Sequence, residues 1–240
     1  MDSNILITIC ARGGSKGLKN KNIKLLNNIP LIVYSINIAF EFSKIYKSDI
    51  AISSDSKRIL DVAHKNGLPT NYNRPKILSS DNVGKIETIE HLLFYEESKN
   101  NKKYDIILDL DVTSPLRNLN DLILSYEKLI NEKDALNLFS VSKSTKNPYF
   151  NMVEIDKNNF AELVKKGNFL TRQSAPKVYE LNASFYLYKR LFFEKKHRYV
   201  ITNKSLIFEM NHICFDIDHL VDFEFMNYLI KYNKLNFKFW

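Results

Sequence analysis

Short apolar segments alternate with amphipathic segments along the first part of the chain. Residues 5–10 form an apolar run that ends in a glycine-containing polar loop, as is typical of a strand buried in a parallel sheet. Similar runs and helical spacings recur, and they predict strands at 49–53, 105–110 and 136–141 and helices at 30–42, 55–66, 83–98 and 118–131. Strand–helix alternation with short connections predicts an α/β fold with a mostly parallel sheet.

The regular alternation of predicted strands and helices ends after residue 141. Strands are predicted at 152–155, 184–188 and 206–209, longer polar segments separate them, and a final helix is predicted at 219–231. We interpret residues 1–240 as a single domain from which about 142–180 leave the sheet and contact another subunit. The composition allows such a domain, because 45% of the residues are hydrophobic and 12% are aromatic.

Signals for a membrane or for secretion are weak. No apolar stretch approaches the ~20 residues that cross a bilayer, and the run at 5–10 is too short for the core of a signal peptide. The two cysteines, Cys10 and Cys214, do not make a disulfide framework. We therefore expect a cytoplasmic protein without a membrane partner.

The formal net charge of +8 indicates an anionic partner. The lysines are spread along the chain, and the densest basic clusters, at 16–24 and 195–198, are short. A basic stripe with interleaved aromatics, which is typical of nucleic-acid binding, is missing. We expect no nucleic-acid partner, although a basic nucleic-acid-binding module stays open as an alternative that rests on charge alone.

Three polar segments follow predicted strands, at the edge where such sheets bind ligands. The first runs from Arg12 to Asn22 and reads R-G-G-S-K-G-L-K-N-K-N. Its glycines let the backbone approach a ligand, and Arg12, Lys16 and Lys21 supply positive charge suited to a triphosphate. The glycine spacing fits neither a Walker A loop nor the G-x-G-x-x-G dinucleotide fingerprint. The alternative is a flexible basic surface loop.

The second segment reads D-L-D-V-T-S-P-L-R and covers 109–117. Asp111 lies at the end of a predicted strand, where it could bind a metal or a hydroxyl. Alternatively, Thr113 or Ser114 only shapes the turn and Arg117 pairs locally.

The third segment is Asp216-Ile217-Asp218. Residues i and i+2 of an extended segment point the same way, so both carboxylates can face one site. Two carboxylates with water and phosphate oxygens form a typical Mg²⁺ environment. The alternative is a cap for the helix that begins near His219.

In this order, the segments resemble the acylneuraminate cytidylyltransferase family, the CMP-sialic acid synthetases. The family's A-R-x-x-S-K-G-x-x-x-K-N loop, R-P-x-x-L-x-x-D segment and T-S-P-L-R motif are matched by 11–22, 74–81 and 113–117. Its R-Q, N-[GA]-[AS] and D-I-D motifs are matched by Arg172-Gln173, Asn182-Ala183-Ser184 and Asp216-Ile217-Asp218. The single motifs are modest, but the ordered set spans nearly the whole chain.

The resemblance implies a Rossmann-like, three-layer α/β fold of the nucleotide-diphospho-sugar transferase type with a dimerisation excursion, and a homodimer that uses CTP and Mg²⁺. It implies that the nucleotide is bound by Ala11, Arg12, Gly13, Ser15, Lys16, Lys21, Asn22, Arg74, Ser80 and Asp81. It implies that the sugar is bound by Asp111, Thr113, Ser114, Arg172, Gln173 and Asn182, and Mg²⁺ by Asp216 and Asp218. Arg12, Lys21 and Asp218 would be the catalytic residues. The alternative for 74–81 is a simple helix cap.

Two positions depart from the common pattern of the family. Asp111-Val112 stands where Gln-Pro is common, and that glutamine contacts the sugar in the family; Glu180 stands in place of an arginine. The D-V-T-S-P-L-R version is more like the branch that activates legionaminic acid, a bacterial relative of sialic acid. The resemblance thus implies transfer of CMP from CTP to the anomeric hydroxyl of a nine-carbon 2-keto-3-deoxy sugar acid, legionaminic or N-acetylneuraminic acid, with release of pyrophosphate, for surface glycan or protein glycosylation.

A sugar-1-phosphate nucleotidyltransferase is the alternative within this type of fold, because it also uses a basic glycine loop. Its attacking group is a phosphate instead of a hydroxyl. The T-S-P-L-R and D-I-D motifs argue against this alternative.

Overall fold

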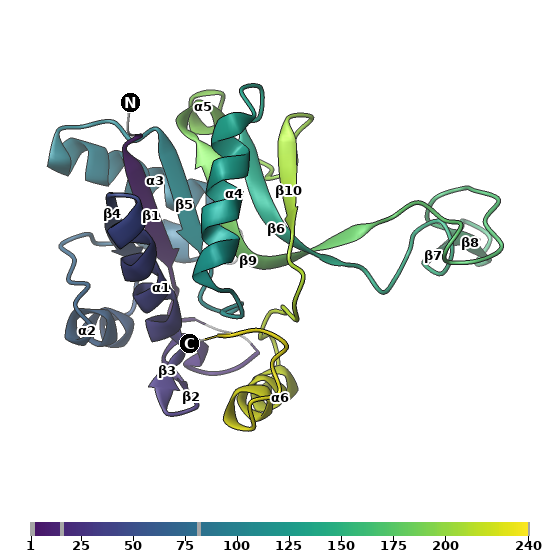
Figure 1. Ribbon diagram of the computed structural model, residues 1–240, viewed down its shortest axis with the longest axis horizontal. Coiled ribbons are helices and arrows are strands. Elements are labelled where there is room, and N and C mark those ends of the chain that lie inside the picture. The colour runs from purple at the N-terminus through teal and green to yellow at the C-terminus, as the bar shows by residue number, and fades with distance from the viewer. Residues whose placement is uncertain (1–2, 15–16, 81–82, 240) are drawn as a thin grey trace.

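The computed structural model describes residues 3–14, 17–80 and 83–239 and is built on one six-stranded sheet with the order β10-β6-β9-β5-β1-β4 (Figure 1). The strands are β1 (Ile5–Cys10), β4 (Ser48–Ser53), β5 (Ile106–Leu110), β6 (Asn137–Lys143), β9 (Tyr179–Lys189) and β10 (Ser205–Glu209). Five of them run in one direction, and β9 lies antiparallel between β5 and β6. The prediction of a mostly parallel sheet is confirmed.

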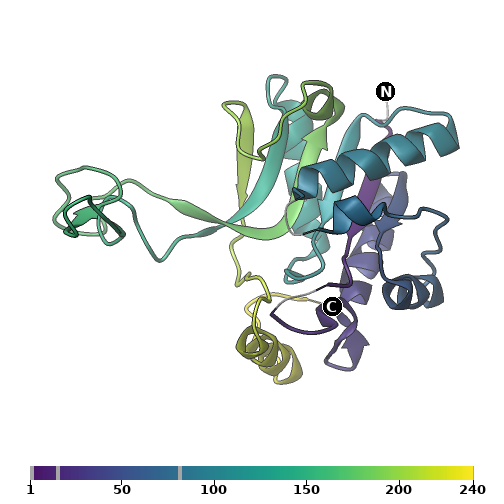
Figure 2. The ribbon, with the colours of Figure 1, turned by 180° about the vertical axis from the view of Figure 1, so that it is seen from behind.

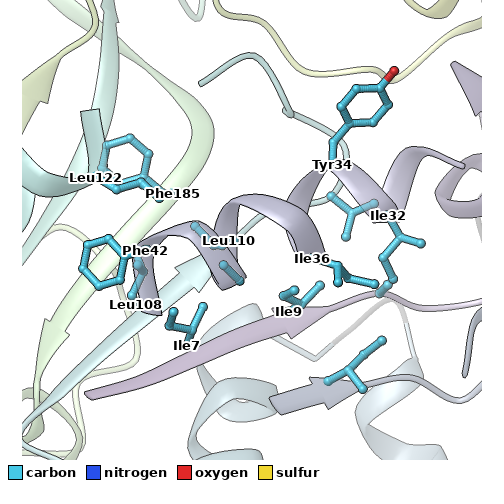
Figure 3. Packing of buried hydrophobic residues seen from close by; sticks show 14 of the residues in the cluster. Ile7, Ile9, Ile32, Tyr34, Ile36, Phe42, Leu108, Leu110, Leu122 and Phe185 are labelled. Atoms are coloured by element: carbon cyan, nitrogen blue, oxygen red, sulfur yellow. The ribbon is translucent and has the colours of Figure 1, made fainter. Parts of the chain in front are cut away.

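Helices cover both faces of this sheet. α1 (Leu31–Ile45) and α4 (Leu119–Asn131) lie on one face and α3 (Lys85–Asn100) lies on the other (Figures 1 and 2). Successive residues of β1 point to opposite faces. Ile7 and Ile9 therefore pack in one apolar cluster with Ile36 of α1 (Figure 3), whereas Leu6 packs in a second cluster with Leu93 of α3. These two apolar layers produce the expected three-layer α/β arrangement.

Several short elements were not predicted from the sequence pattern. They are η1 (Lys21–Ile23), β2 (Leu25–Leu26), β3 (Ile29–Pro30), η2 (Lys76–Ser79) and α5 (Arg190–Glu194). The remaining helices, α2 (Lys57–Lys65) and α6 (Leu220–Lys231), were predicted. Pro30, which was expected to be the first residue of α1, is its N-cap instead. No helix in the described part of the chain combines the length and the apolar character needed to cross a membrane.

Between β6 and β9 the chain leaves the sheet as an arm, residues 144–178, which projects far from the body (Figure 1). The arm carries one antiparallel pair, β7 (Val153–Ile155) and β8 (Ala161–Leu163). A two-stranded pair has no second layer to cover its apolar side chains. Accordingly, Phe160 and Leu170 are 72% and 94% exposed. The predicted contact of this segment with another subunit stays a prediction.

Candidate active site

A cleft of about 410 Å³ opens beyond the carboxyl ends of β1 and β5. This is the edge at which parallel α/β sheets bind ligands. The cleft brings together nine of the predicted ligand-binding residues, which come from distant parts of the chain: Arg12, Lys21, Asn22, Arg74, Ser80, Asp111, Thr113, Asp216 and Asp218. Ser15, Lys16 and Asp81, which were also predicted to bind the nucleotide, lie outside the described residues.

The first half of the glycine loop is fastened by hydrogen bonds. Nδ2 of Asn22 donates to the carbonyl oxygen of Arg12 at 2.9 Å, so these two ends of the loop are tied together. The amide of Gly13 donates to Oδ1 of Asp55 at 2.8 Å. Neither Gly13 nor Ala11 lines the cleft. Their predicted role at the nucleotide stays a prediction, and the structure shows the part that Gly13 takes in holding the loop.

The second half of the loop packs against Asp216-Ile217-Asp218. The backbone of Gly17 lies so close to the carbonyl oxygen of Asp218 that no Cβ atom would fit. Nζ of Lys21 donates to the carbonyl oxygen of Ile217 and lies 3.5 Å from Oδ1 of Asp218. The basic segment and the acidic segment are thus in direct contact.

Asp216 and Asp218 suit a divalent cation. Oδ1 of Asp216 is buried and has no hydrogen-bond partner among the described residues, so a cation would satisfy an acceptor that nothing else satisfies. Burial, followed by the charge of Asp111, raises the pKa of Asp216. Within 3–14, 17–80 and 83–239, no three His, Cys, Asp or Glu side chains form a metal cluster, so phosphate oxygens and water would complete the coordination. The N-cap of α6 is His219, not either aspartate.

Arg74 ties one wall of the cleft to β4. Its side chain is buried, and Nε and Nη2 donate to Oγ and the carbonyl oxygen of Ser53 at 2.7 and 2.6 Å. Ser80 lies exposed on the rim. The N-cap of α3 is Gly84, whose amide donates to the carboxylate of Glu87. None of residues 74–80, which the structure describes, caps this helix, and their predicted role at the nucleotide stays a prediction.

Lys85 is a cleft residue that the sequence did not reveal. It is the first residue of α3, and its Nζ lies 2.7 Å from Oδ2 of Asp109 and 2.6 Å from Oδ2 of Asp111. Burial lowers the pKa of Lys85, but the two aspartates outweigh burial, and the net pKa lies well above the ordinary value. A lysine is unfavourable at a helix N-terminus because the helix dipole opposes it. This unfavourable position at the start of the helix was the one feature of the sequence that could have pointed to Lys85.

Ser114 and Asn182 were predicted to bind the sugar, but both are buried and neither lines the cleft. Oγ of Ser114 donates to the carbonyl oxygen of Asn182 at 2.7 Å. Nη1 of buried Arg117 donates to the carbonyl oxygens of Ser114 and Ser184 at 2.8 and 2.7 Å. The side chains of Ser114 and Arg117 thus form hydrogen bonds that hold the turn after β5 against β9. Arg117 therefore pairs both within this turn and, through Ser184, with a distant strand.

Arg172 and Gln173, the other predicted sugar-binding residues, lie exposed on the arm. Nη2 of Arg172 donates to the carbonyl oxygen of Ser144 at 3.1 Å, at the base of the arm. Neither residue lines the cleft of its own chain. Glu180, at the start of β9, lies outside the cleft as well.

Comparisons with known proteins agree with this geometry. The chain is 40% identical to post-translational flagellin modification protein B of Campylobacter coli over 98% of this chain and 99% of that protein. It is also 40% identical to CMP-N,N'-diacetyllegionaminic acid synthase of Campylobacter jejuni, over 98% of each. A CMP:2-keto-3-deoxy-manno-octonic acid synthetase solved with CTP shares the fold, with a TM-score of 0.69 at 12% identity over 96% of this chain and 100% of that one. Residues 6–235 match the family described as cytidylyltransferase, and the chain belongs to that family.

Proposed function

We propose that this protein transfers CMP from CTP to the anomeric hydroxyl of a nine-carbon 2-keto-3-deoxy sugar acid and releases pyrophosphate. The observation that carries the proposal is the contact, in one cleft, between the basic loop with Lys21 and the carboxylates of Asp216 and Asp218. A metal-bound triphosphate needs cations and carboxylates side by side. The names of the relatives supply the class of acceptor. Legionaminic acid is our first candidate and N-acetylneuraminic acid our second, for surface glycan or protein glycosylation.

The triphosphate is assigned to the glycine loop. Arg12 and Lys21 stabilise the charge that builds on the leaving pyrophosphate, and Asn22 holds the shape of the loop through its bond to Arg12. Arg74 and Ser80 are assigned to the cytosine and ribose side. Attack of the sugar hydroxyl on the α-phosphorus displaces pyrophosphate directly, so no covalent enzyme intermediate is needed.

A divalent metal is general among cytidylyltransferases, and we propose Mg²⁺ on Asp216 and Asp218. When bound, the ion lowers the pKa of the attacking hydroxyl and offsets phosphate charge. The chain itself orients Asp218, because Lys21 pairs with its carboxylate and the backbone of Gly17 packs against its carbonyl oxygen. Fixed groups of this kind act without reorganising during the reaction.

The acceptor end of the cleft is assigned to Asp111 and Thr113. Oδ1 of Asp111 accepts hydrogen bonds from the amide and the hydroxyl of Thr113, both at 2.8 Å. Ser114 and Asn182 support this turn from the interior. The sugar thus meets a carboxylate where an amide is common in the family.

We further propose a homodimer, in which a second copy covers the exposed apolar surface of the arm. Apolar patches of this kind mark interaction sites in soluble proteins. In such a dimer the arm's Arg172 and Gln173 can serve the sugar end of a cleft. Sedimentation of wild type and of the doubly substituted Phe160→Ser/Leu170→Ser protein tests it: the variant is expected to sediment as a monomer, and a monomeric wild type contradicts the dimer. We propose the cytoplasm as the place of the reaction, where the CTP pool lies.

Pyrophosphate release from CTP tests the function, with a panel of legionaminic, N-acetylneuraminic, pseudaminic and octulosonic acids. The highest kcat/KM is expected with legionaminic acid, in the presence of Mg²⁺. A parallel series pairs CTP or UTP with hexose 1-phosphates. Turnover in that series, without turnover of any sugar acid, would show that the protein is a sugar-1-phosphate nucleotidyltransferase.

A further inference from the structure

Lys85 lies between three side chains at the acceptor end of the cleft. Its ammonium lies 2.7 Å from Asp109 and 2.6 Å from Asp111, and 5.0 Å from the centroid of the Tyr186 ring. Asp109 is fully buried and also accepts a hydrogen bond from Oγ1 of Thr8 at 2.8 Å. The ammonium is thus held by two carboxylates and an aromatic face, and none of these contacts has a place in the reaction described above.

The hydrogen bonds of Asp111 leave it one open position. A carboxylate has about four lone-pair sites. Two sites of Oδ1 are taken by the amide and the hydroxyl of Thr113, and one site of Oδ2 is taken by Lys85. Asp111 lines the cleft with 19% of its side chain exposed, so Oδ2 can accept one further hydrogen bond from a group in the cleft.

The same ammonium makes Asp111 a poor metal ligand. A divalent cation on Oδ2 of Asp111 would lie beside the positive charge of Lys85, and like charges at such short distance repel. Asp216 differs, because its buried Oδ1 has no partner in the described chain. Among the described carboxylates that line the cleft, Asp111 has a lysine ammonium at 2.6 Å, whereas the ion pair of Asp218 with Lys21 is longer, at 3.5 Å.

We propose that Lys85 is a positioning residue that keeps the divalent cation on Asp216 and Asp218 and reserves Asp111 as a hydrogen-bond acceptor for a hydroxyl or amide N–H of the acceptor sugar. This inference rests on the proposed function. It also predicts which groups of the sugar Asp111 prefers to bind. An ionised carboxylate can only accept, whereas an amide at the same place can donate as well. The cleft therefore selects a sugar that presents a donor group at this point.

Kinetics of Lys85→Met test the positioning role. The KM of the sugar acid is expected to rise about tenfold, because one charge-assisted hydrogen bond loses its alignment, while the KM of CTP stays within about twofold. Lys85→Arg restores the positive charge and is expected to recover part of the loss. Lys99→Met removes a lysine that is 47% exposed on the same helix and is expected to match wild type. Equal changes in the two KM values would overturn the inference.

Loss of Lys85 leaves Asp109 buried without its counter-ion, and this can unfold the protein. The double variant Lys85→Met/Asp109→Asn removes that charge and keeps an oxygen for Thr8. It is compared with Asp109→Asn alone. The same selective rise in the KM of the sugar acid is expected between these two proteins, and its absence would refute the role of Lys85.

Binding of Mn²⁺, followed by electron paramagnetic resonance with a non-hydrolysable CTP analogue, tests the metal assignment without turnover. Asp111→Asn is expected to bind Mn²⁺ as wild type does, and Asp216→Asn to bind it at least about tenfold more weakly. Loss of Mn²⁺ from Asp111→Asn would assign that carboxylate to the metal and overturn the proposal. If wild type turns over no sugar acid, the proposed function fails. If wild type turns over a sugar acid and the KM values of the Lys85 variants equal those of wild type, this inference fails while the proposed function stands.

Discussion

A Cβ atom on Gly17 would lie 2.2 Å from the carbonyl oxygen of Asp218, which is closer than real Cβ atoms approach. The glycine loop and the acidic segment therefore meet only because residue 17 has no side chain. Gly17→Ala is expected to push them apart and to lower kcat/KM for CTP by about 10²-fold, since a shift of about 1 Å at a reacting site has effects of that size. Pyrophosphate release at varied CTP concentration measures this loss.

Gly14→Ala is the matched control, because a Cβ atom there meets nothing within 4 Å. The two variants lose the same backbone freedom in the same loop. Gly14→Ala is expected to change kcat/KM by no more than about threefold. Equal losses in both variants would mean that the flexibility of the loop matters and the contact with Asp218 does not.

The positive charge of Lys21 should contribute to catalysis and not only to the structure of the loop. Lys21→Met keeps most of the apolar stem but removes the ammonium that pairs with Asp218 and faces the cleft. If this group stabilises pyrophosphate as an oxyanion donor does, kcat should fall about 10²–10³-fold, or about 2.7–4 kcal/mol of barrier. Lys19→Met changes an exposed lysine of the same loop that does not line the cleft, and it should leave kcat unchanged. Undiminished kcat in Lys21→Met excludes the role.

The residues that local pattern could identify are those that follow a strand. Arg12 follows β1 and Asp111 follows β5, and the carboxyl ends of parallel strands face one edge of the sheet. The sequence thus predicted that the basic loop and Asp111 share a site. It also predicted the paired orientation of Asp216 and Asp218 from extended spacing alone. The cleft brings all of these together.

The direction in which other motif residues point depends on long-range pairing, which local pattern does not reveal. β9 lies antiparallel between β5 and β6, so the turn after β5 bonds to a strand far along the chain. For this reason Ser114 bonds to Asn182 in the interior and does not line the cleft. Lys85 was missed for the converse reason: it belongs to no motif, and only the docking of α3 brings it to Asp109 and Asp111.

Asp216→Asn should reveal the metal requirement. The neutral amide keeps the size of the side chain but removes the charge of an acceptor that has no partner within the described residues. We expect the Mg²⁺ concentration for half-maximal velocity to rise by about tenfold or more, because a ligand charge is lost. Velocity measured across a Mg²⁺ series checks this shift. Glu224→Gln, an exposed carboxylate of α6 outside the cleft, should leave the Mg²⁺ curve in place. An Asp216→Asn curve that overlays wild type would remove Asp216 from the metal site.

The fold also contains one histidine whose protonation should stabilise it. Nε2 of His212 lies 2.9 Å from Oδ2 of Asp121 in the first turn of α4, and its ring stacks on Phe237 at 3.7 Å between centroids. Burial lowers the pKa of His212, but the hydrogen bonds to Asp121 and to the carbonyl of Ile213 outweigh burial, so the net pKa is raised above 6.5.

Because folding raises this pKa, the folded protein binds the proton more tightly than the unfolded chain does. The added stability is fully present below the unfolded pKa of 6.5 and is lost as the pH rises through the higher folded pKa. Urea unfolding from roughly pH 5.5 to pH 8.5 should therefore show the free energy of unfolding declining above pH 6.5 in wild type. His212→Gln should flatten this decline, whereas His64→Gln, which changes an exposed histidine of α2, should keep it. A decline that survives in His212→Gln would place its origin in another group.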